Sequence, residues 1–210
     1  MAPREAILRA ALREFAGRGF EGARVERVAR AARVNKALLY YYYGSKAGLY
    51  EAVLLRNFEK VHGALAGALA LPLPAEGRLR ALVEALLRVL EEMPEHPLLL
   101  LREVAAGGSH LPPAVLRRMG EAFLKVRALL EDGRRRGEFR EVSPLLVHLQ
   151  LLGATAFLRA SGPLRRRIAE SLGGAGLAEP LGEDFARQVG DLLLRGIGSP
   201  PKAGVARRRP

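Results

Sequence analysis

Four consecutive tyrosines, Tyr40 to Tyr43, stand between Lys36 and Lys46 in the stretch VNKALLYYYYGSKAGLY. The chain has one other tyrosine, Tyr50, and no tryptophan. Four consecutive side chains cannot all face one side of a helix or a strand, so some of these phenols must point outward. Phenol hydroxyls and lysine ammonium groups donate hydrogen bonds to phosphate oxygens, and this stretch is therefore a candidate surface for an anionic partner.

The formal net charge of +12 is concentrated at the two ends of the 210-residue chain. Residues 1–50 hold 10 Lys or Arg against 4 Asp or Glu, residues 51–197 hold 20 against 18, and residues 198–210 hold 4 against none. A basic N-terminal part beside a nearly neutral body favours an anionic polymer as partner of that part. Arginine is also simply abundant, 29 against 5 lysines, so composition alone leaves both interpretations open.

Several protein classes are disfavoured by composition. The chain has no cysteine, which excludes disulfides and Cys-ligated metal sites and fits a reducing cytoplasm. The N-terminus carries charges every few residues, unlike a signal peptide. The longest uncharged stretch, Val142 to Leu158, includes Ser, His and Gln and predicts a buried helix, not a membrane span. We therefore expect a cytoplasmic, nucleoid-associated protein with no membrane contact, cofactor or metal.

Apolar residues recur at helical spacing along the whole chain, and no segment alternates as a strand would. This pattern predicts an all-α protein of about nine helices, near residues 3–16, 25–32, 34–43, 46–69, 79–93, 98–106, 115–130, 144–159 and 185–194. Ser45 is placed to cap the fourth helix. Gly17 and Gly19 are expected to end the first helix, and Gly133 with Gly137 the seventh. Residues 198–210, rich in Pro, Gly and Arg, are expected to form a disordered basic tail.

Three short helices within the first ~45 residues are about the size of a helix-turn-helix module. The stretch from residue 4 to residue 54 resembles the N-terminal domain of TetR-type (TetR/AcrR) transcriptional repressors. The resemblance is carried by an ordered series of positions: Ile7, Ala11, Phe15 and Gly19, then VERVA, then VNKALLYYYYGSK and Leu49. It implies a helix-turn-helix DNA-binding domain at residues 1–48, and a helical ligand-binding and dimerisation domain at residues 49–197.

The resemblance assigns roles within the tyrosine run. Leu39 and Tyr43 share one helix face and are expected to pack into the core, as is Tyr50. The opposite face would enter the major groove, where a lysine can donate to guanine and apolar groups can contact a thymine methyl. The residues expected to contact double-stranded operator DNA are Arg24, Asn35, Lys36, Ala37, Tyr40, Tyr41, Tyr42 and Lys46. Lys46 lies in the first turn of the fourth helix, a position that favours an anion.

Two positions depart from the family pattern. Arg24 stands where relatives usually have a Thr or Ser that caps the second helix and touches a phosphate. Arg33 occupies a turn position that usually carries glycine. A non-glycine residue with positive φ costs roughly 1 kcal/mol, so this turn is expected to be either strained or reshaped.

The resemblance also implies that the C-terminal domain dimerises and binds a small apolar or amphipathic inducer. GEFR, residues 137–140, resembles the common turn between the seventh and eighth helices. Helix 144–159, with small residues Gly153, Ala154 and Ala156, and the Phe185–Leu194 helix would form a homodimer interface. Polar or aromatic residues that interrupt aliphatic helices are weak candidates for the ligand pocket: Phe58, His62, Arg88, Phe123, Arg127 and Gln150.

Two other functions compete with that of a ligand-responsive repressor. An enzyme is disfavoured because the four histidines are scattered and the sequence has no HExxH or nucleophile motif. His96 and His110 sit beside proline turns, where loop histidines are commoner than metal ligands. A nucleoid-binding or partner-recruiting protein with the same fold and no small ligand stays open, because nothing in the sequence excludes it.

Overall fold

The computed structural model describes residues 3–174, 176, 177 and 183–198. Within these residues all regular secondary structure is helical, apart from one isolated antiparallel bridge between Phe139 and Gly198. The helices are α1 (Pro3–Gly22), α2 (Val25–Ala32), α3 (Lys36–Tyr43), α4 (Lys46–Leu69), α5 (Ala75–Glu92), α6 (His96–Ala105), α7 (Pro113–Arg135), α8 (Pro144–Leu152), a π-helical turn η1 (Gly153–Phe157), α9 (Leu158–Ala160), α10 (Gly162–Ser171) and α11 (Glu183–Ile197). The all-α prediction is confirmed.

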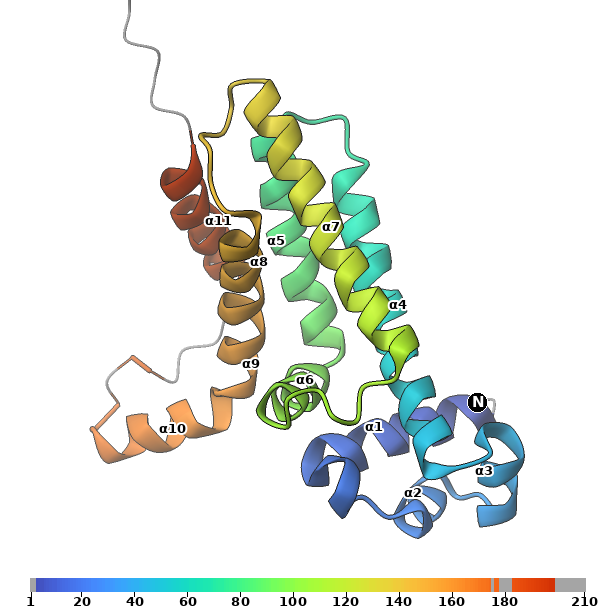
Figure 1. Cartoon of the computed structure of the whole chain (residues 1–210). Helices are drawn as coiled ribbons and strands as arrows, with labels where there is room; N and C mark the ends of the chain where they lie inside the picture. Colours follow the sequence, from blue (N-terminus) through green and yellow to red (C-terminus); the bar gives the residue numbers. More distant parts are fainter. Residues whose placement is uncertain (1–2, 175, 178–182, 199–210) are drawn as a thin grey trace, which may run out of the picture.

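The helices form a small base and a taller body. Helices α1 to α3 lie at the base, and α4 rises from them to run alongside α5 and α7, with α8 and α11 on the far side of α5 (Figure 1). The base has its own buried core, in which Phe15, Leu39 and Tyr50 are almost fully enclosed. A second core fills the body between α4, α5, α7, α8 and α11. Helix α4 contributes to both cores and is thus the main structural link between them.

The GEFR turn joins three helices at the upper end of the body. Phe139 is buried in the second core, and the Glu138 carboxylate accepts a hydrogen bond of 3.0 Å from the Glu76 backbone N–H at the start of α5. The Arg140 side chain donates to the Gly196 carbonyl oxygen in α11. These contacts attach the turn that follows α7 to the start of α5 and the end of α11.

Several expected boundaries need correction. Gly133 does not end α7, which continues to Arg135; a glycine is needed there because the Phe139 ring packs against its Cα. Pro97 does not stop a helix but lies in the first turn of α6, where its missing N–H costs no hydrogen bond. Gly19, by contrast, breaks the first helix as predicted, with φ of 71°. Helix α10 was not predicted, because GPLRRRIAES has three consecutive arginines and few apolar residues.

The uncharged stretch Val142–Leu158 is only half buried, which corrects the expectation of a buried helix. Val147 and Leu151 face the core, whereas Leu145, Leu146, Leu149 and Phe157 are exposed on the single chain. Among the described helices none alone is long and apolar enough to span a membrane; Pro144–Ala160 and Gly162–Ser171, bent by 60°, meet the length and composition test only as a pair. The predicted tail, apart from Gly198, lies outside the described residues.

Substituting Gly133 tests the packing under the GEFR turn. A Cβ at Gly133 would overlap the Phe139 ring and lie 2.9 Å from the Cβ of Ala75. We expect Gly133→Ala to lower the free energy of unfolding by about 1–3 kcal/mol in urea titrations, as overpacked cores do. Gly63→Ala is the control, because a Cβ there meets nothing within 4 Å. It should raise stability by up to ~1 kcal/mol through helix propensity; equal losses in both variants would contradict the packing argument.

Candidate DNA-binding surface and ligand pocket

Helix α3 is held in the base by one face and exposes the other. Asn35 caps it, its side-chain oxygen accepting a 2.7 Å hydrogen bond from the Ala37 N–H. Leu39 is fully buried and anchors the helix against α1, α2 and α4. Lys36, Ala37, Tyr40 and Tyr41 are all exposed on the opposite side. The helix therefore presents a continuous surface with a cation, a methyl group and two phenols.

The tyrosines separate by environment much as their spacing predicts. Tyr41 is 81% exposed, and its ring makes an edge contact with Tyr42, which is half-buried under the Arg4 guanidinium. Tyr43 packs into the base, and its hydroxyl donates to the Arg4 carbonyl oxygen at 3.3 Å. Tyr50 is buried between Phe15 and Phe20. Two tyrosines thus serve the core, and Tyr40 with Tyr41 is left for the surface.

Lys36 is restrained by a neighbouring acid. Its ammonium group forms a salt bridge with Glu26 of α2 and lies 5.6 Å from the centre of the Tyr40 ring. The hydrogen bond with Lys36 lowers the pKa of Glu26 and, from the other side, raises that of Lys36. Both groups are exposed, so the pair orients the lysine more than it stabilises the fold. Glu26 was not singled out in the sequence, although it lies one helix away from Lys36.

Lys46 is also engaged within the base. Its ammonium donates a 3.1 Å hydrogen bond to the Glu21 carbonyl oxygen and sits 4.8 Å above the Phe20 ring. Beside it Ser45 caps α4, accepting from the Gly48 N–H at 3.0 Å, as predicted. The lysine therefore ties the start of α4 to the end of α1, close to the free N–H groups of the α4 first turn.

The two departures from the family pattern have definite outcomes. Arg24 precedes α2 without a side-chain capping bond; instead its backbone N–H donates to the Glu14 carboxylate at 3.2 Å. Its side chain is exposed. Arg33 adopts the left-handed conformation with φ of 55° and ψ of 44°, so the turn between α2 and α3 keeps the glycine-type geometry. The left-handed conformation of a non-glycine residue therefore destabilises this turn by about 1 kcal/mol, and the turn is not reshaped to avoid it.

Helix α6 is the part of the body that contacts the base most directly after α4. The Arg102 guanidinium donates to the carbonyl oxygens of Ala16 at 2.7 Å and Gly17 at 2.9 Å. These carbonyls lie where α1 is interrupted at Gly19, so they have lost their partners within the helix. Arg102 replaces those partners, and a movement of α6 must either carry the end of α1 with it or break both bonds.

A buried polar cluster reinforces this junction. The Glu103 carboxylate is 2% exposed and accepts a 2.5 Å hydrogen bond from the Tyr50 hydroxyl of α4. Burial, and then this hydrogen bond, raise the pKa of Tyr50. His110 lies between Glu103 and Glu21, 3.3 Å from each carboxylate, and its ring is tilted by 31° against the Phe20 ring, with 4.9 Å between their centres. His110 is therefore an element of the junction and shares no site with His96.

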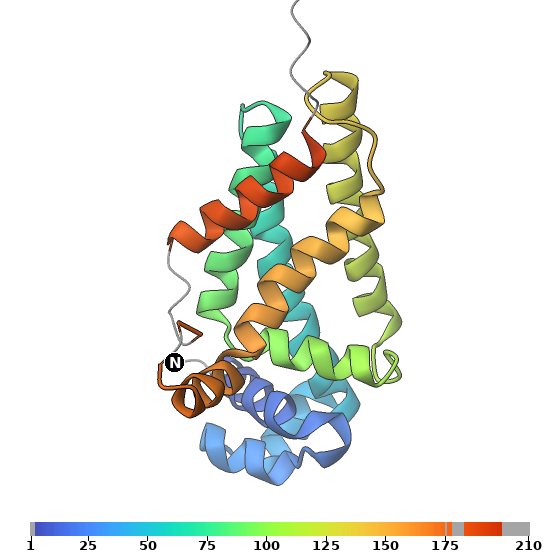
Figure 2. The same cartoon turned by 90° about the vertical axis from the view of Figure 1, so that its left-hand side faces the viewer.

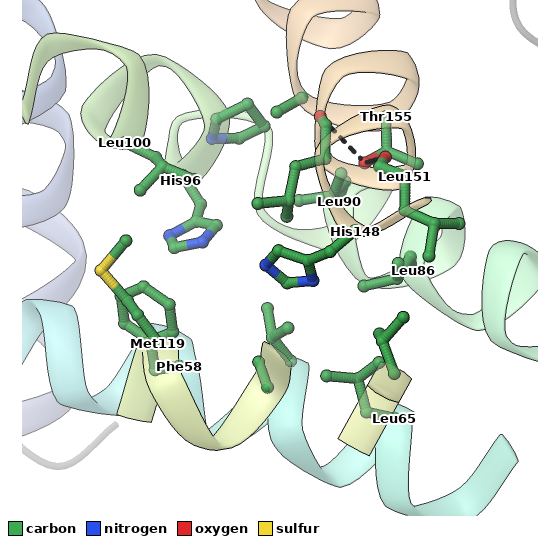
Figure 3. Close-up of a pocket in the computed structure, with 16 residues that line it drawn as sticks. Phe58, Leu65, Leu86, Leu90, His96, Leu100, Met119, His148, Leu151 and Thr155 are labelled. Atoms are coloured by element: carbon green, nitrogen blue, oxygen red, sulfur yellow. Dashed lines mark hydrogen bonds between the residues drawn. The ribbon is translucent and has the colours of Figure 1, made fainter. Parts of the chain in front are cut away.

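An apolar cavity of about 70 Å³ lies in the body, directly above this junction. It is surrounded by α4, α5, α6, α7, α8 and η1 (Figure 3). The Thr155 hydroxyl donates to the Leu151 carbonyl oxygen at 2.7 Å, which competes with the regular helical bond and accompanies the π-helical turn. That turn brings Thr155 and Ala156 to the cavity wall.

Two histidines, His96 of α6 and His148 of α8, supply the polar groups of the cavity besides Thr155. Figure 3 shows their rings directed into it from two different walls, that of His96 from α6 and that of His148 from α8. Burial lowers the pKa of His96 to about 4 and also lowers that of His148, so both imidazoles are neutral near pH 7. The Nδ1 atom of His96 is buried without a hydrogen-bond partner.

Of the pocket residues expected from the sequence, only Phe58 lines the cavity. Arg88, Arg127 and Gln150 are exposed, and Arg127 pairs with Glu131 one turn away. His62 is buried, but its Nε2 donates to the Arg118 carbonyl oxygen at 2.7 Å. Phe123 makes an edge contact with His148 from outside the lining. These five residues lie outside the lining of this cavity, whereas His96 and His148, which line it, are not among the residues that the sequence predicts.

The described residues contain no group of three or more acidic or histidine side chains positioned to hold a metal ion. A three-helix base with an exposed, lysine-bearing third helix, joined to a helical body with an apolar cavity, defines a helix-turn-helix transcriptional regulator. The family model for bacterial regulatory proteins of the tetR family matches residues 7–53, and a tetracyclin repressor-like C-terminal domain matches residues 74–171. The chain belongs to the TetR family.

Similarity to individual proteins extends over most of the chain. It is 30% identical over 200 residues to the HTH-type transcriptional repressor NicS of Pseudomonas putida, covering 92% of both chains. It is 33% identical over 171 residues to an HTH-type transcriptional repressor of Streptomyces coelicolor, covering 81% of this chain and 84% of that one. The crystal structure of the TetR family regulator PfmR from Thermus thermophilus superposes with a TM-score of 0.73 at 26% identity, over 93% and 97% of the two chains. These relatives are DNA-binding regulators, not enzymes.

The buried His96 makes stability depend on pH in a defined direction. Its pKa falls from 6.5 in the unfolded chain to about 4 in the fold, so the unfolded state binds the extra proton first. Its contribution is complete above pH 6.5 and is lost as the pH falls to 4, on the order of 3 kcal/mol in total. Urea unfolding at fixed protein concentration should show His96→Leu losing less stability than the parent between pH 7 and pH 4. Parallel losses would contradict the buried neutral imidazole.

Proposed function

We propose that the protein is a ligand-responsive repressor that binds a palindromic operator as a homodimer and is released by a small apolar or amphipathic inducer. Residues 1–48 serve as the DNA-binding domain, and residues 49–197 as the ligand-binding and dimerisation domain. The observation that carries the proposal is the position of α6, whose residues line the cavity at one end and hold α1 at the other. TetR-family regulators bind operator DNA and act as dimers with small-molecule ligands. Two relatives are named transcriptional repressors, which supports repression over activation.

In this proposal α3 enters the major groove. Lys36 would donate to a guanine edge, and Ala37 with the Tyr40 ring would contact a thymine methyl. Arg24, Asn35, Tyr41, Tyr42 and Lys46 would contact the sugar-phosphate backbone and set the position of α3 without reading the sequence. Because Lys36 is paired with Glu26 in the free protein, base recognition requires exchanging that carboxylate for a base edge. At DNA sequences that offer Lys36 no hydrogen-bond acceptor, the lost salt bridge with Glu26 would not be replaced, and binding would be weaker.

The dimer would form through α8 and α11. Leu145, Leu146 and Leu149 of α8 are exposed, and Leu192 of α11 is 70% exposed. Both helices run across the same face of the body (Figure 2). A Cβ at Gly153, just after α8, meets no atom within 4 Å, which leaves room for a close helix from a partner. One recognition helix contacts too few base pairs to select an operator, so two related copies are needed.

Induction would act through α6. His96, Pro97 and Leu100 line a cavity of about 70 Å³, less than half the roughly 150 Å³ that holds benzene. An occupant of ring size must therefore displace side chains, and a shift of α6 is transmitted to Ala16 and Gly17 through Arg102. The inducer weakens operator binding by its preference for the shifted state and by no more than that preference.

Three lysine variants test the DNA surface on an operator obtained by binding-site selection. Lys46→Ala should weaken binding to every duplex and reduce the slope of log K against log salt by about one unit. Lys36→Ala should change which operators are preferred, costing roughly 1–3 kcal/mol at one base pair. Lys60→Ala is the charge-matched control, since 14 residues along α4 amount to ~20 Å from Lys46 and two Debye lengths at 0.1 M salt. Fluorescence anisotropy measures all three, and three equal losses would refute the assigned face.

A charge in the exposed leucine cluster tests the dimer. Leu149→Asp should convert the protein to a monomer in analytical ultracentrifugation at micromolar concentration, because a buried unpaired carboxylate opposes the contact. Specific operator binding should fall at least tenfold with it. Leu116→Asp is the matched control, since Leu116 is similarly exposed but lies on α7. A Leu149→Asp protein that remains dimeric would eliminate this interface.

A further inference from the structure

The chemistry of the cavity restricts what can occupy it. Its lining includes no Asp, Glu, Lys or Arg from any of the six elements that surround it. Most of the wall is aliphatic or aromatic, with Phe58, Leu65, Leu86 and Met119 among the contributors. A charged ligand group would enter this space without a counter-ion, and burying an unpaired charge is strongly unfavourable. The occupant must therefore be uncharged over the part that enters.

The polar groups that remain are two neutral imidazoles. The hydroxyl of Thr155 already donates to the Leu151 carbonyl oxygen. His96 is only 4% exposed, and its buried Nδ1 atom has no hydrogen-bond partner. A buried nitrogen without a hydrogen bond costs about 1–3 kcal/mol, so the fold carries an unmet requirement at this position. His148 borders the same space from α8 (Figure 3).

A neutral imidazole has one donor nitrogen and one acceptor nitrogen. A hydroxyl group can donate to one histidine while accepting from the other, which neither a carboxylate nor a quaternary ammonium can do. A hydrocarbon would leave the buried Nδ1 atom of His96 without a hydrogen-bond partner. Compared with a carboxylate, a quaternary ammonium or a hydrocarbon, the hydroxyl therefore complements this pair of side chains best.

We propose that the cavity selects an uncharged, largely apolar molecule carrying a hydroxyl, of the phenol or alcohol class, and that His96 and His148 recognise this hydroxyl. This inference rests on the proposed function, because it names the class of inducer. The apolar part displaces flexible lining side chains such as Met119. His96 belongs to α6, so the group that recognises the ligand is in the same helix that holds the DNA-binding domain through Arg102.

Three probes with one skeleton test the class: 4-propylphenol, 4-propylbenzoate and propylbenzene, titrated by calorimetry at pH 7.5. We expect the phenol to bind at least tenfold more tightly than the benzoate and several-fold more tightly than the hydrocarbon. Benzoate binding equal to or tighter than phenol binding would overturn the proposal, as would no binding of the phenol at millimolar concentration.

Histidine variants test the recognition groups. His96→Phe and His148→Phe should each abolish the preference for phenol over propylbenzene and leave propylbenzene affinity within about twofold. His110→Phe is the control, because His110 lies at the junction outside the cavity. An undiminished phenol preference in both cavity variants would overturn the assignment. Imidazole ¹⁵N spectra of the unaltered protein provide a readout that does not depend on variant folding: the phenol should shift His96 and His148 and leave His110 unchanged, and the absence of a His96 shift would contradict the proposal.

Operator binding is measured in the same samples to separate the two levels of inference. Phenol binding with histidine dependence but without release from the operator supports the selectivity and refutes the inducer role. Release from the operator by the benzoate, with no histidine dependence, supports the inducible repressor and refutes the ligand class.

Discussion

The junction between base and body depends on carbonyl oxygens that α1 leaves without partners. A glycine at position 19 interrupts the helix, and Arg102 of α6 satisfies the Ala16 and Gly17 carbonyls from the other domain. A hydrogen bond between a charged donor and a carbonyl is directional and costly to leave unmade when partly buried. Polar contacts with defined geometry thus help to orient the base, together with the apolar contacts of its core, which includes Leu99 of α6 and Val115 of α7.

The cavity and the Arg102 contact with the base share one helix, α6. Three residues of the cavity wall, His96, Pro97 and Leu100, lie with Arg102 on one helix of ten residues, at most ~15 Å long. Helix α4 also lines the cavity, at Phe58, and carries Tyr50, whose hydroxyl meets the buried Glu103. Glu103 gains one good hydrogen bond and leaves its second oxygen without a partner, so the cluster is not optimised for stability. Imperfect satisfaction at a domain junction is expected of an element that must hold two arrangements.

The sequence predicted the base far better than the pocket, for physical reasons. Capping by Ser45 depends on residues within one helical turn, so a local pattern predicts it. The burial of Leu39 and the special turn position of Arg33 are implied by the family resemblance, which left both a strained and a reshaped turn open. The pocket depends on how six separate elements meet. Arg88, Arg127 and Gln150 interrupt apolar helices because they face water, the commoner reason for such interruptions. A better signal was a histidine inside an apolar run, as at His148, or beside a helix-starting proline, as at His96. Helix α10 was not predicted because its two large apolar residues, Leu164 and Ile168, are exposed and form no core-facing stripe.

The π-helical turn after α8 connects three surfaces. Thr155 and Ala156 face the cavity, Gly153 and Phe157 face outward beside the exposed leucines of α8, and the turn also packs on α6. In a regular α-helix each residue is rotated by ~100° about the helix axis relative to the one before it. A turn that contains one extra residue changes the direction in which all later side chains point. The Thr155 hydroxyl accompanies the wider turn by donating to the Leu151 carbonyl oxygen. A change in the geometry of this turn would therefore alter the cavity wall, the contact with α6 and the exposed surface of α8 together.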